Sequence, residues 1–206
     1  MAGQDQLMDT AEVLIGERGL AVSLREIAAH AQHRNTSAVI YHFGGVDGLI
    51  VATLQRRMTV LEQRRQELLD ELDTRSDVGP HEIVEAIVAP ALEIPYEQGA
   101  THYARFVERI RDHPAIAKTT PTLEKWPAVV ALTRRLTEFI PEESRRGQAR
   151  RIRLMSTAMF ALMADYERRG ELDSTRKRKR ACEELTSILV GLLTAPVRQP
   201  ISAKEI

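Results

Sequence analysis

The sequence predicts an all-α protein, with an N-terminal head of three helices that contains a helix-turn-helix and a larger helical body. Apolar residues recur at three- and four-residue spacing along most of the chain, as they do on the buried face of a helix. Aromatic residues make up only 4% of the 206 residues, and no useful stretch alternates apolar with polar residues as a half-buried strand does. The first proline is Pro80, so long helices are possible before it.

The composition is that of a globular protein with a sizeable core. Hydrophobic residues make up 43% of the chain and charged residues 28%, which is ordinary for a globular domain. The formal net charge is zero, so the total charge does not by itself indicate a nucleic-acid partner. No apolar stretch approaches the ~20 residues that span a bilayer, and no signal-peptide pattern opens the chain. We expect a cytoplasmic protein that has no membrane partner and needs no cofactor.

Three helices are predicted in the head, residues 1–46, and glycines and capping residues mark their ends. The first ends at Gly19, a typical helix terminator. Ser23 and Glu26 form a capping box at the start of the second. The three helices are expected over 4–18, 24–31 and 35–42.

The body, residues 47–206, begins with a long linking helix over 47–72 and continues with helices that prolines separate. Pro90 is expected to kink the first of these, and Gly170 separates the last two. Arg56-Arg57 and Arg64-Arg65 are expected on the solvated face of the linking helix. The later helices are expected over 81–97, 101–112, 122–139, 142–169 and 176–194.

Residues 23–43 have the features of a helix-turn-helix. Ala28 and Ala31 are small enough to let two short helices approach closely at a tight polar turn. The second helix of such a motif points its N-terminal residues at base edges in the major groove. Hydrogen-bonding side chains occupy that position here, namely Arg34, Asn35, Thr36 and Ser37.

This stretch resembles the DNA-binding head of TetR/AcrR-type transcriptional regulators over residues 6–55, about a quarter of the chain. The resemblance implies a ligand-responsive regulator, most simply a repressor, that binds a palindromic operator in double-stranded DNA as a homodimer. The rest of the chain is similar to the family only in length and helical character. The matching residues are Gly19-Leu20, Leu24-Arg25-Glu26-Ile27-Ala28-Ala29-His30-Ala31, Tyr41-His42-Phe43-Gly44 and Leu49.

The resemblance also implies roles for single residues of the head. Tyr41 and His42 would contact the DNA backbone, and the backbone amide of Gly45 would hold a phosphate at the start of the linking helix. The second helix would cross the DNA backbone, and the third would contact base edges. The predicted DNA-binding residues are Ser23, Arg25, Arg34, Asn35, Thr36, Ser37, Tyr41, His42 and Gly45.

The head departs from the family pattern in three ways. The turn before the third helix is one residue longer than usual. Val46 stands where many members carry a phosphate-binding lysine, and Ile40 where many carry a tyrosine. Residues 1–60 contain six acidic and five basic side chains. The alternative hypothesis is therefore a helical interaction module that has lost specific DNA binding.

The two closing helices carry apolar residues at helical spacing, and the resemblance implies that they form a four-helix contact between two copies of the chain. Part of each stripe must also serve the core of its own chain. The predicted dimer residues are Ile152, Leu162, Tyr166, Leu185, Ile188, Leu189 and Leu192.

A pocket for an unknown, largely apolar small molecule is expected in the body, because methionines recur at four-residue spacing and adapt to irregular partners. Ordinary core packing explains the same methionines equally well. The predicted ligand-binding residues are His102, Tyr103, Phe106, Arg109, Trp126, Met155, Met159 and Met163.

An enzyme is the least supported alternative. The sequence contains no nucleophile elbow, phosphate-binding loop or zinc-ligand spacing. His81 and Glu85 lie one helical turn apart, but two ligands of different types on one helix are a weak sign of a metal site. The basic run 176–180 is interpreted as a solvated loop and helix start rather than a second DNA contact.

Overall fold

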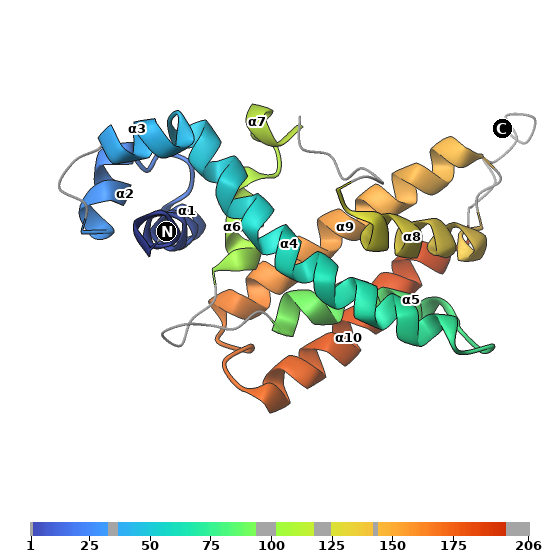
Figure 1. Cartoon of the computed structure of the whole chain (residues 1–206). Coiled ribbons are helices and arrows are strands. Elements are labelled where there is room, and N and C mark those ends of the chain that lie inside the picture. The colour runs from blue at the N-terminus through green and yellow to red at the C-terminus, as the bar shows by residue number, and fades with distance from the viewer. Residues whose placement is uncertain (1, 33–36, 94–101, 118–124, 142–143, 197–206) are drawn as a thin grey trace, which may run out of the picture.

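The computed structural model describes residues 2–32, 37–93, 102–117, 125–141 and 144–196. Every regular element within these ranges is a helix (Figure 1), which confirms the all-α prediction. None of the helices described has the length and apolar character needed to cross a membrane.

The head consists of three helices, and a fourth leads from it into the body (Figure 1). The third predicted helix begins at Ser37 within the described residues, and the others agree with prediction to within a few residues. The four helices are α1 (Ala2–Arg18), α2 (Leu24–His30), α3 (Ser37–Phe43) and α4 (Val46–Asp73).

Within the residues that the structure describes, the body adds six α-helices and one short 3-10 turn. The four-residue helix α7 was not predicted from the sequence. The helix predicted over 122–139 is shorter, because its described part begins at the N1 proline Pro127 and tightens into the 3-10 turn. The elements are α5 (Pro80–Glu93), α6 (Tyr103–Ile110), α7 (Pro114–Ala117), α8 (Pro127–Leu136), the 3-10 turn Thr137–Phe139, α9 (Arg145–Arg168) and α10 (Thr175–Thr194).

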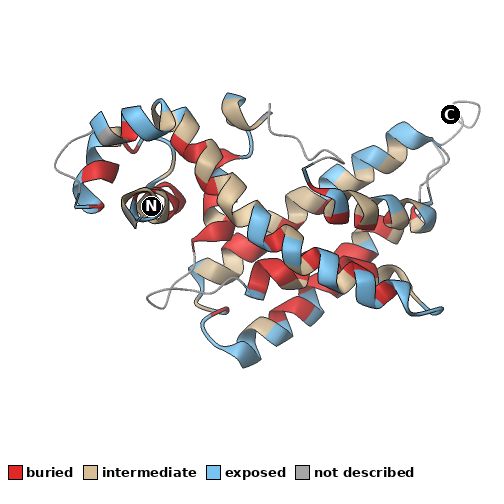
Figure 2. Cartoon of the chain, in the orientation of Figure 1, coloured by how far each residue is buried: buried red, intermediate tan, exposed pale blue. Residues whose placement is uncertain are grey.

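Helix α5 lies at the centre of the body. It contacts α4, α8 and α10, and buried residues surround it on several faces (Figure 2). A helix that is apolar over most of its surface must be covered over most of it, and the exposed positions of α5 are His81, Glu85 and Glu93. Each fully buried Ile or Leu side chain contributes about 1.5–3 kcal/mol, so this one helix accounts for much of the burial that holds the body together.

Two helices of the body receive their N-terminal caps from other helices. Neither α6 nor α8 has a capping side chain of its own. The carboxylate of Glu167 on α9 accepts hydrogen bonds from the backbone amides of Ala104 (2.8 Å) and Arg105 (3.0 Å) at the start of α6. Glu62 on α4 does the same for the first amides of α8. These contacts fix where each short helix begins, because a carboxylate is favourable at a helix N-terminus.

Replacing Glu167 with Ala is expected to lower the free energy of unfolding by about 2–4 kcal/mol, because two backbone amides lose a buried acceptor and Arg105 loses an ion pair. The Glu167 side chain is 1% exposed and lies 3.6 Å from Arg105 Nε. Urea unfolding measures the loss. Glu183→Ala, at an exposed position of α10, is the control. An equal loss in the free energy of unfolding for the two variants would contradict the capping role of Glu167.

Candidate functional site

The capping box at the start of α2 is present. Ser23 Oγ accepts from the backbone amide of Glu26 at 3.2 Å, and the Glu26 carboxylate accepts from the Ser23 amide at 2.9 Å. Ile27 and Ala28 are buried on the inner side of α2. The opposite side of the helix presents Arg25, which is exposed and forms no ion pair with any residue that the structure describes.

Helix α3 presents a mixed apolar and aromatic surface to solvent. Val39 is buried and anchors the helix, whereas Ile40 is 56% exposed and Tyr41 is 85% exposed. The Tyr41 ring meets the edge of the His42 ring, and His42 Nδ1 lies 2.9 Å from the side-chain amide of Gln4 on α1. Ser37 is exposed at the first described position of α3. Arg34, Asn35 and Thr36 lie outside the described residues.

The junction between α3 and α4 depends on Gly48. A side chain at Gly48 would overlap the carbonyl oxygen of Phe43 at the end of α3, so the two helices can meet at this angle only with glycine there. Gly45 is the N-cap of α4 and supplies no side-chain hydrogen bond. The amides at the start of this 28-residue helix therefore have no capping side chain, as an anion site requires.

Two arginines of α4 pair with acidic residues of α1. Arg57 Nε donates to Glu12 Oε2 at 2.7 Å, and Arg56 contacts Asp9 and, at 3.6 Å, Asp5. Burial opposes the charge of Arg57, but the hydrogen-bonded Glu12 carboxylate outweighs burial, and the pKa of Arg57 is raised. The prediction that Arg56 and Arg57 lie on a solvated face is therefore wrong, because α1 covers this side of α4.

The other acidic residues of the head also have partners. Glu17 lies 3.2 Å from His102 Nε2, and Asp47 lies 3.7 Å from His113 Nε2. Glu26 belongs to the capping box, and its hydrogen bonds from Ser23 lower the pKa of its carboxyl group. All six acidic residues of positions 1–60 thus have a partner within the chain, and Glu12 is buried. Arg56 and Arg57 offset the charge of the three carboxylates on the side of α1 that faces α4.

Helix α6 joins the body to the head. His102, at its N-cap, contacts Glu17 of α1, and a side chain at Gly16 of α1 would come within 3.2 Å of the His102 carbonyl oxygen. Arg109 is exposed, on the side of α6 that approaches Gly19. His102 and Arg109, predicted as polar groups of a ligand pocket, therefore face α1 instead, because the head packs on this side of α6.

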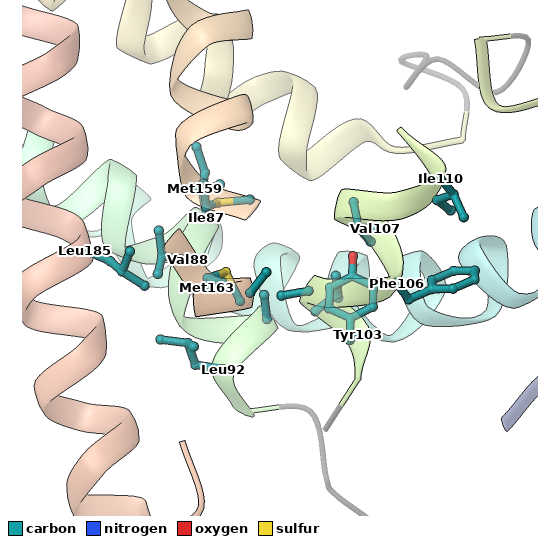
Figure 3. Close-up of a cluster of buried hydrophobic side chains, with 14 of the residues drawn as sticks. Ile87, Val88, Leu92, Tyr103, Phe106, Val107, Ile110, Met159, Met163 and Leu185 are labelled. Carbon is teal, nitrogen blue, oxygen red and sulfur yellow. The ribbon is translucent and has the colours of Figure 1, made fainter. Parts of the chain in front are cut away.

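The other predicted ligand-binding residues are buried in the body (Figure 3). Tyr103 is 1% exposed, its hydroxyl donates to Met58 Sδ at 3.8 Å, and its ring meets the edge of Phe160. Buried with it are Phe106, Met155, Met159 and Met163. Their role in ligand binding stays a prediction.

Trp126 lies apart from this cluster, beside a surface groove of about 510 Å³ between α4 and the start of α8. Within the described ranges, no group of three or more His, Cys, Asp or Glu side chains is placed to hold a metal ion. The groove is lined by Gln55, Thr59, Glu62, Gln63, Gln66, Lys125, Trp126 and Pro127.

The predicted dimer residues divide into two groups. Leu185 and Leu189 are 0% exposed, on a helix that packs against α5. Their assignment to the dimer contact is wrong, because the core of their own chain uses their whole surface. Ile188 is 43% exposed, and the other four are half-buried: Ile152, Leu162, Tyr166 and Leu192. Leu154 on α9, which was not among the predicted dimer residues, is also an exposed apolar side chain, at 42%.

Sequence analysis also missed Arg65. It was expected in solvent, but its side chain is among the most buried of the charged groups, at 2% exposure. It lies four residues from both Leu61 and Leu69 on the buried stripe of α4. A position one helical turn from two apolar residues is the feature of the sequence that indicates burial of Arg65.

A family model described as tetracyclin repressor-like, C-terminal domain, matches residues 85–195, which is more than half of the chain. The ketosteroid transcriptional regulator KstR2 of Mycobacterium tuberculosis is 15% identical, with a TM-score of 0.53 over 91% of this chain and 93% of that one. A Rhodococcus sp. protein described as a TetR-family transcriptional regulator is 14% identical, with a TM-score of 0.52 over 92% of this chain and 100% of that one. At these identities the two structures show the fold alone. No curated protein matches the sequence.

Acidification is expected to loosen the contact between α6 and α1. Burial lowers the pKa of His102 from its ordinary value of 6.5, assisted by Arg105 and opposed by Glu17. The unfolded chain therefore takes up the proton more readily. The contribution of neutral His102 to the free energy of unfolding is fully present above about pH 6.5, the pKa of the imidazole in the unfolded chain. It is lost as the pH falls from that value toward the lower pKa of His102 in the folded protein.

Urea unfolding at pH values on both sides of this range tests the effect. His102→Gln should lose less stability on acidification than the wild type. His81→Gln, at an exposed position of α5, should retain the full loss. Identical pH dependence in all three proteins would exclude His102 as its source.

Proposed function

Since the chain belongs to the TetR family of transcriptional regulators, we propose that it is a ligand-responsive repressor that binds a palindromic operator as a homodimer in the cytoplasm. The observation that carries the proposal is the arrangement of charge in the head. Each acidic side chain has a partner within the chain, while Arg25, Tyr41 and the start of α4 remain accessible. This leaves an outer face that a DNA backbone can approach.

In this proposal α3 enters the major groove and α2 crosses the backbone. Ser37, at the first described turn of α3, is exposed, and base contacts are proposed for it and for Arg34, Asn35 and Thr36, which precede it in the sequence. The exposed Ile40 suits the C5-methyl group of thymine, the one apolar group in the major groove. Tyr41, His42, Ser23 and the amide of Gly45 would contact sugar and phosphate, which position the head without selecting sequence.

Dimerisation is proposed through the outer sides of α9 and α10. Leu154, Leu162, Ile188 and Leu192 keep surface that their own chain does not cover. Burial, assisted by Glu184 of α10, raises the pKa of Tyr166 on α9 to about 12. A two-fold contact through this face would hold two heads at a fixed separation, as adjacent half-sites require.

The proposed response to ligand runs through α6. Tyr103 lies in the core of the body, and the preceding residue, His102, contacts Glu17 in the head. A ligand that prefers one placement of α6 would therefore favour the placement of α1, and the orientation of α3, that goes with it. The equilibrium between the two placements would shift by the difference in the free energy of ligand binding to each.

The alternative of an interaction module without DNA binding draws support from Val46. This first residue of α4 is half-buried against the core and offers no positive charge to a phosphate. The alternative gains if neither Arg25→Ala nor Tyr41→Ala changes the binding of any DNA while the dimer survives.

Arg25→Ala is expected to weaken binding to all DNA sequences alike and to reduce the slope of log K against log salt by about 1, because one phosphate contact is lost. Gel shifts with the gene's own upstream DNA and with a selected oligonucleotide pool, at several salt concentrations, measure both effects. Arg176→Ala, exposed in the basic run of α10, should leave the slope unchanged. The proposed function fails if the wild type binds neither DNA specifically at moderate salt.

Ile188→Glu is expected to weaken the dimer by about 10- to 100-fold or more, because the change occurs twice in a two-fold interface and buries a charge in an apolar contact. Sedimentation over a range of protein concentrations measures the dissociation constant. Val60→Glu changes an apolar side chain of similar exposure on α4 and should leave the dimer intact. Equal effects of the two substitutions would place the interface elsewhere.

A further inference from the structure

Arg65 is a buried cation within an apolar stripe. Its side chain is 2% exposed, and the neighbouring buried positions of α4 are Leu61, Leu69 and Leu72. Removing a charged group from water is costly unless a counter-charge and hydrogen bonds replace the water. The surroundings of this guanidinium therefore call for a physical explanation.

The guanidinium uses one of its three nitrogens in a hydrogen bond. Nη2 donates to the carbonyl oxygen of Ile87 on α5 at 3.2 Å, while Nε and Nη1 have no acceptor among the residues that the structure describes. Hydrogen bonds to Glu67 and Glu93 raise the pKa of the neighbouring Arg64, whereas burial lowers that of Arg65. Arg65 therefore keeps unused donors in a place that water does not reach.

The acid that lies one helical turn before Arg65 on α4 is already engaged. Glu62 precedes it by three residues, on the same side of the helix, but the Glu62 carboxylate accepts hydrogen bonds from the amides of Ala128 and Val129 at the start of α8. Pairing Glu62 with Arg65 would remove the cap of α8. The missing acceptor is more easily supplied by a molecule from outside the chain.

We propose that Arg65 binds the carboxylate of an apolar effector acid. The inference rests on the proposed ligand-responsive role and specifies the class of ligand. A planar guanidinium with several N–H donors matches a carboxylate. A single buried positive charge is neutralised by a monoanion, whereas a phosphate dianion would leave a net negative charge in the core.

The groups around Arg65 suit the rest of such a molecule. Tyr103 is electrostatically coupled to Arg65, and burial raises the pKa of its phenol, so the hydroxyl keeps its proton. That hydroxyl donates to the thioether sulfur of Met58, which is a weak acceptor. A carboxylate oxygen is a stronger acceptor and would favourably take the place of the sulfur. Met163 and Met159 lie in the same buried cluster (Figure 3), and methionine side chains can rearrange around an apolar tail.

A surface groove lies on the adjacent side of α4, where an effector could first bind. The groove of about 510 Å³ is lined by Glu62 and Trp126, and its size is within the range of small-molecule sites. An acid that reaches Arg65 would act on Tyr103 at the first turn of α6, next to the contact between His102 and Glu17.

Calorimetry on the full-length protein tests the proposal. The probes are octanoate and phenylbutyrate, their alcohols octanol and phenylbutanol, and octyl phosphate, at about pH 7.5, where a carboxylic acid is ionised. We expect at least one acid to bind about tenfold or more tightly than its alcohol and more tightly than octyl phosphate. The absence of any preference for acid over alcohol, or tighter binding of the phosphate, would overturn the assignment.

Two variants test the residue itself. Arg65→Met should bind acid and alcohol equally, and its urea midpoint should match or exceed that of the wild type, because an unpaired buried charge is replaced by a side chain of similar length. Arg65→Lys should retain a reduced preference for the acid. Arg64→Met, on the exposed neighbour, should behave as the wild type. A variant Arg65→Met that loses stability and keeps the acid preference would show that Arg65 serves the structure alone.

Gel shifts on the same preparations separate this proposal from the proposed function. Specific DNA binding without an acid preference overturns the role of Arg65 and leaves the regulator standing. An acid preference without specific DNA binding supports the role of Arg65 and overturns the regulator. DNA release by the acid in the wild type, but not in Arg65→Met, supports both.

Discussion

The ion pairs between α1 and α4 determine how the head is held and which of its surfaces remain available. Arg56 and Arg57 draw Asp5, Asp9 and Glu12 into the contact between the two helices. Glu12 is almost fully buried there, and a buried carboxylate is tolerated only with a hydrogen-bonded cation. The same contact pairs Asp5 and Asp9 with Arg56, so the ion pairs that hold the head on α4 also offset part of the acidic charge of α1.

Helix α6 extends this arrangement into the body. It is only eight residues long and would be marginal by itself, yet it is held at both faces. Glu167 of α9 caps its first amides, and Gly16 lets α1 approach it closely. A short helix defined by its neighbours moves when they move, which makes it a suitable connection between the core of the body and the head.

The body combines a well-packed centre with one group that packing does not satisfy. Helix α5 is buried along most of its surface against α4, α8 and α10, and such a core normally excludes unpaired charge. Arg65 lies at the edge of this core with two unpartnered nitrogens among the described residues. Proteins tolerate local costs of this kind where a site serves binding rather than stability.

The sequence alone determined the helices and the helix-turn-helix, because capping residues, glycines and helical periodicity act over a few neighbouring positions. Ser23 with Glu26 and the glycines after Phe43 are read from adjacent residues. Only the tertiary structure decided which charged side chains face inward. Arg57, Arg65 and His102 look like solvated or ligand-facing groups until α1 and α5 are in place, and Leu185, Leu189 and Ile188 share one apolar stripe until α5 covers two of them. Periodicity shows that a helix has a buried side, but the partner that covers it comes from residues far away in the chain.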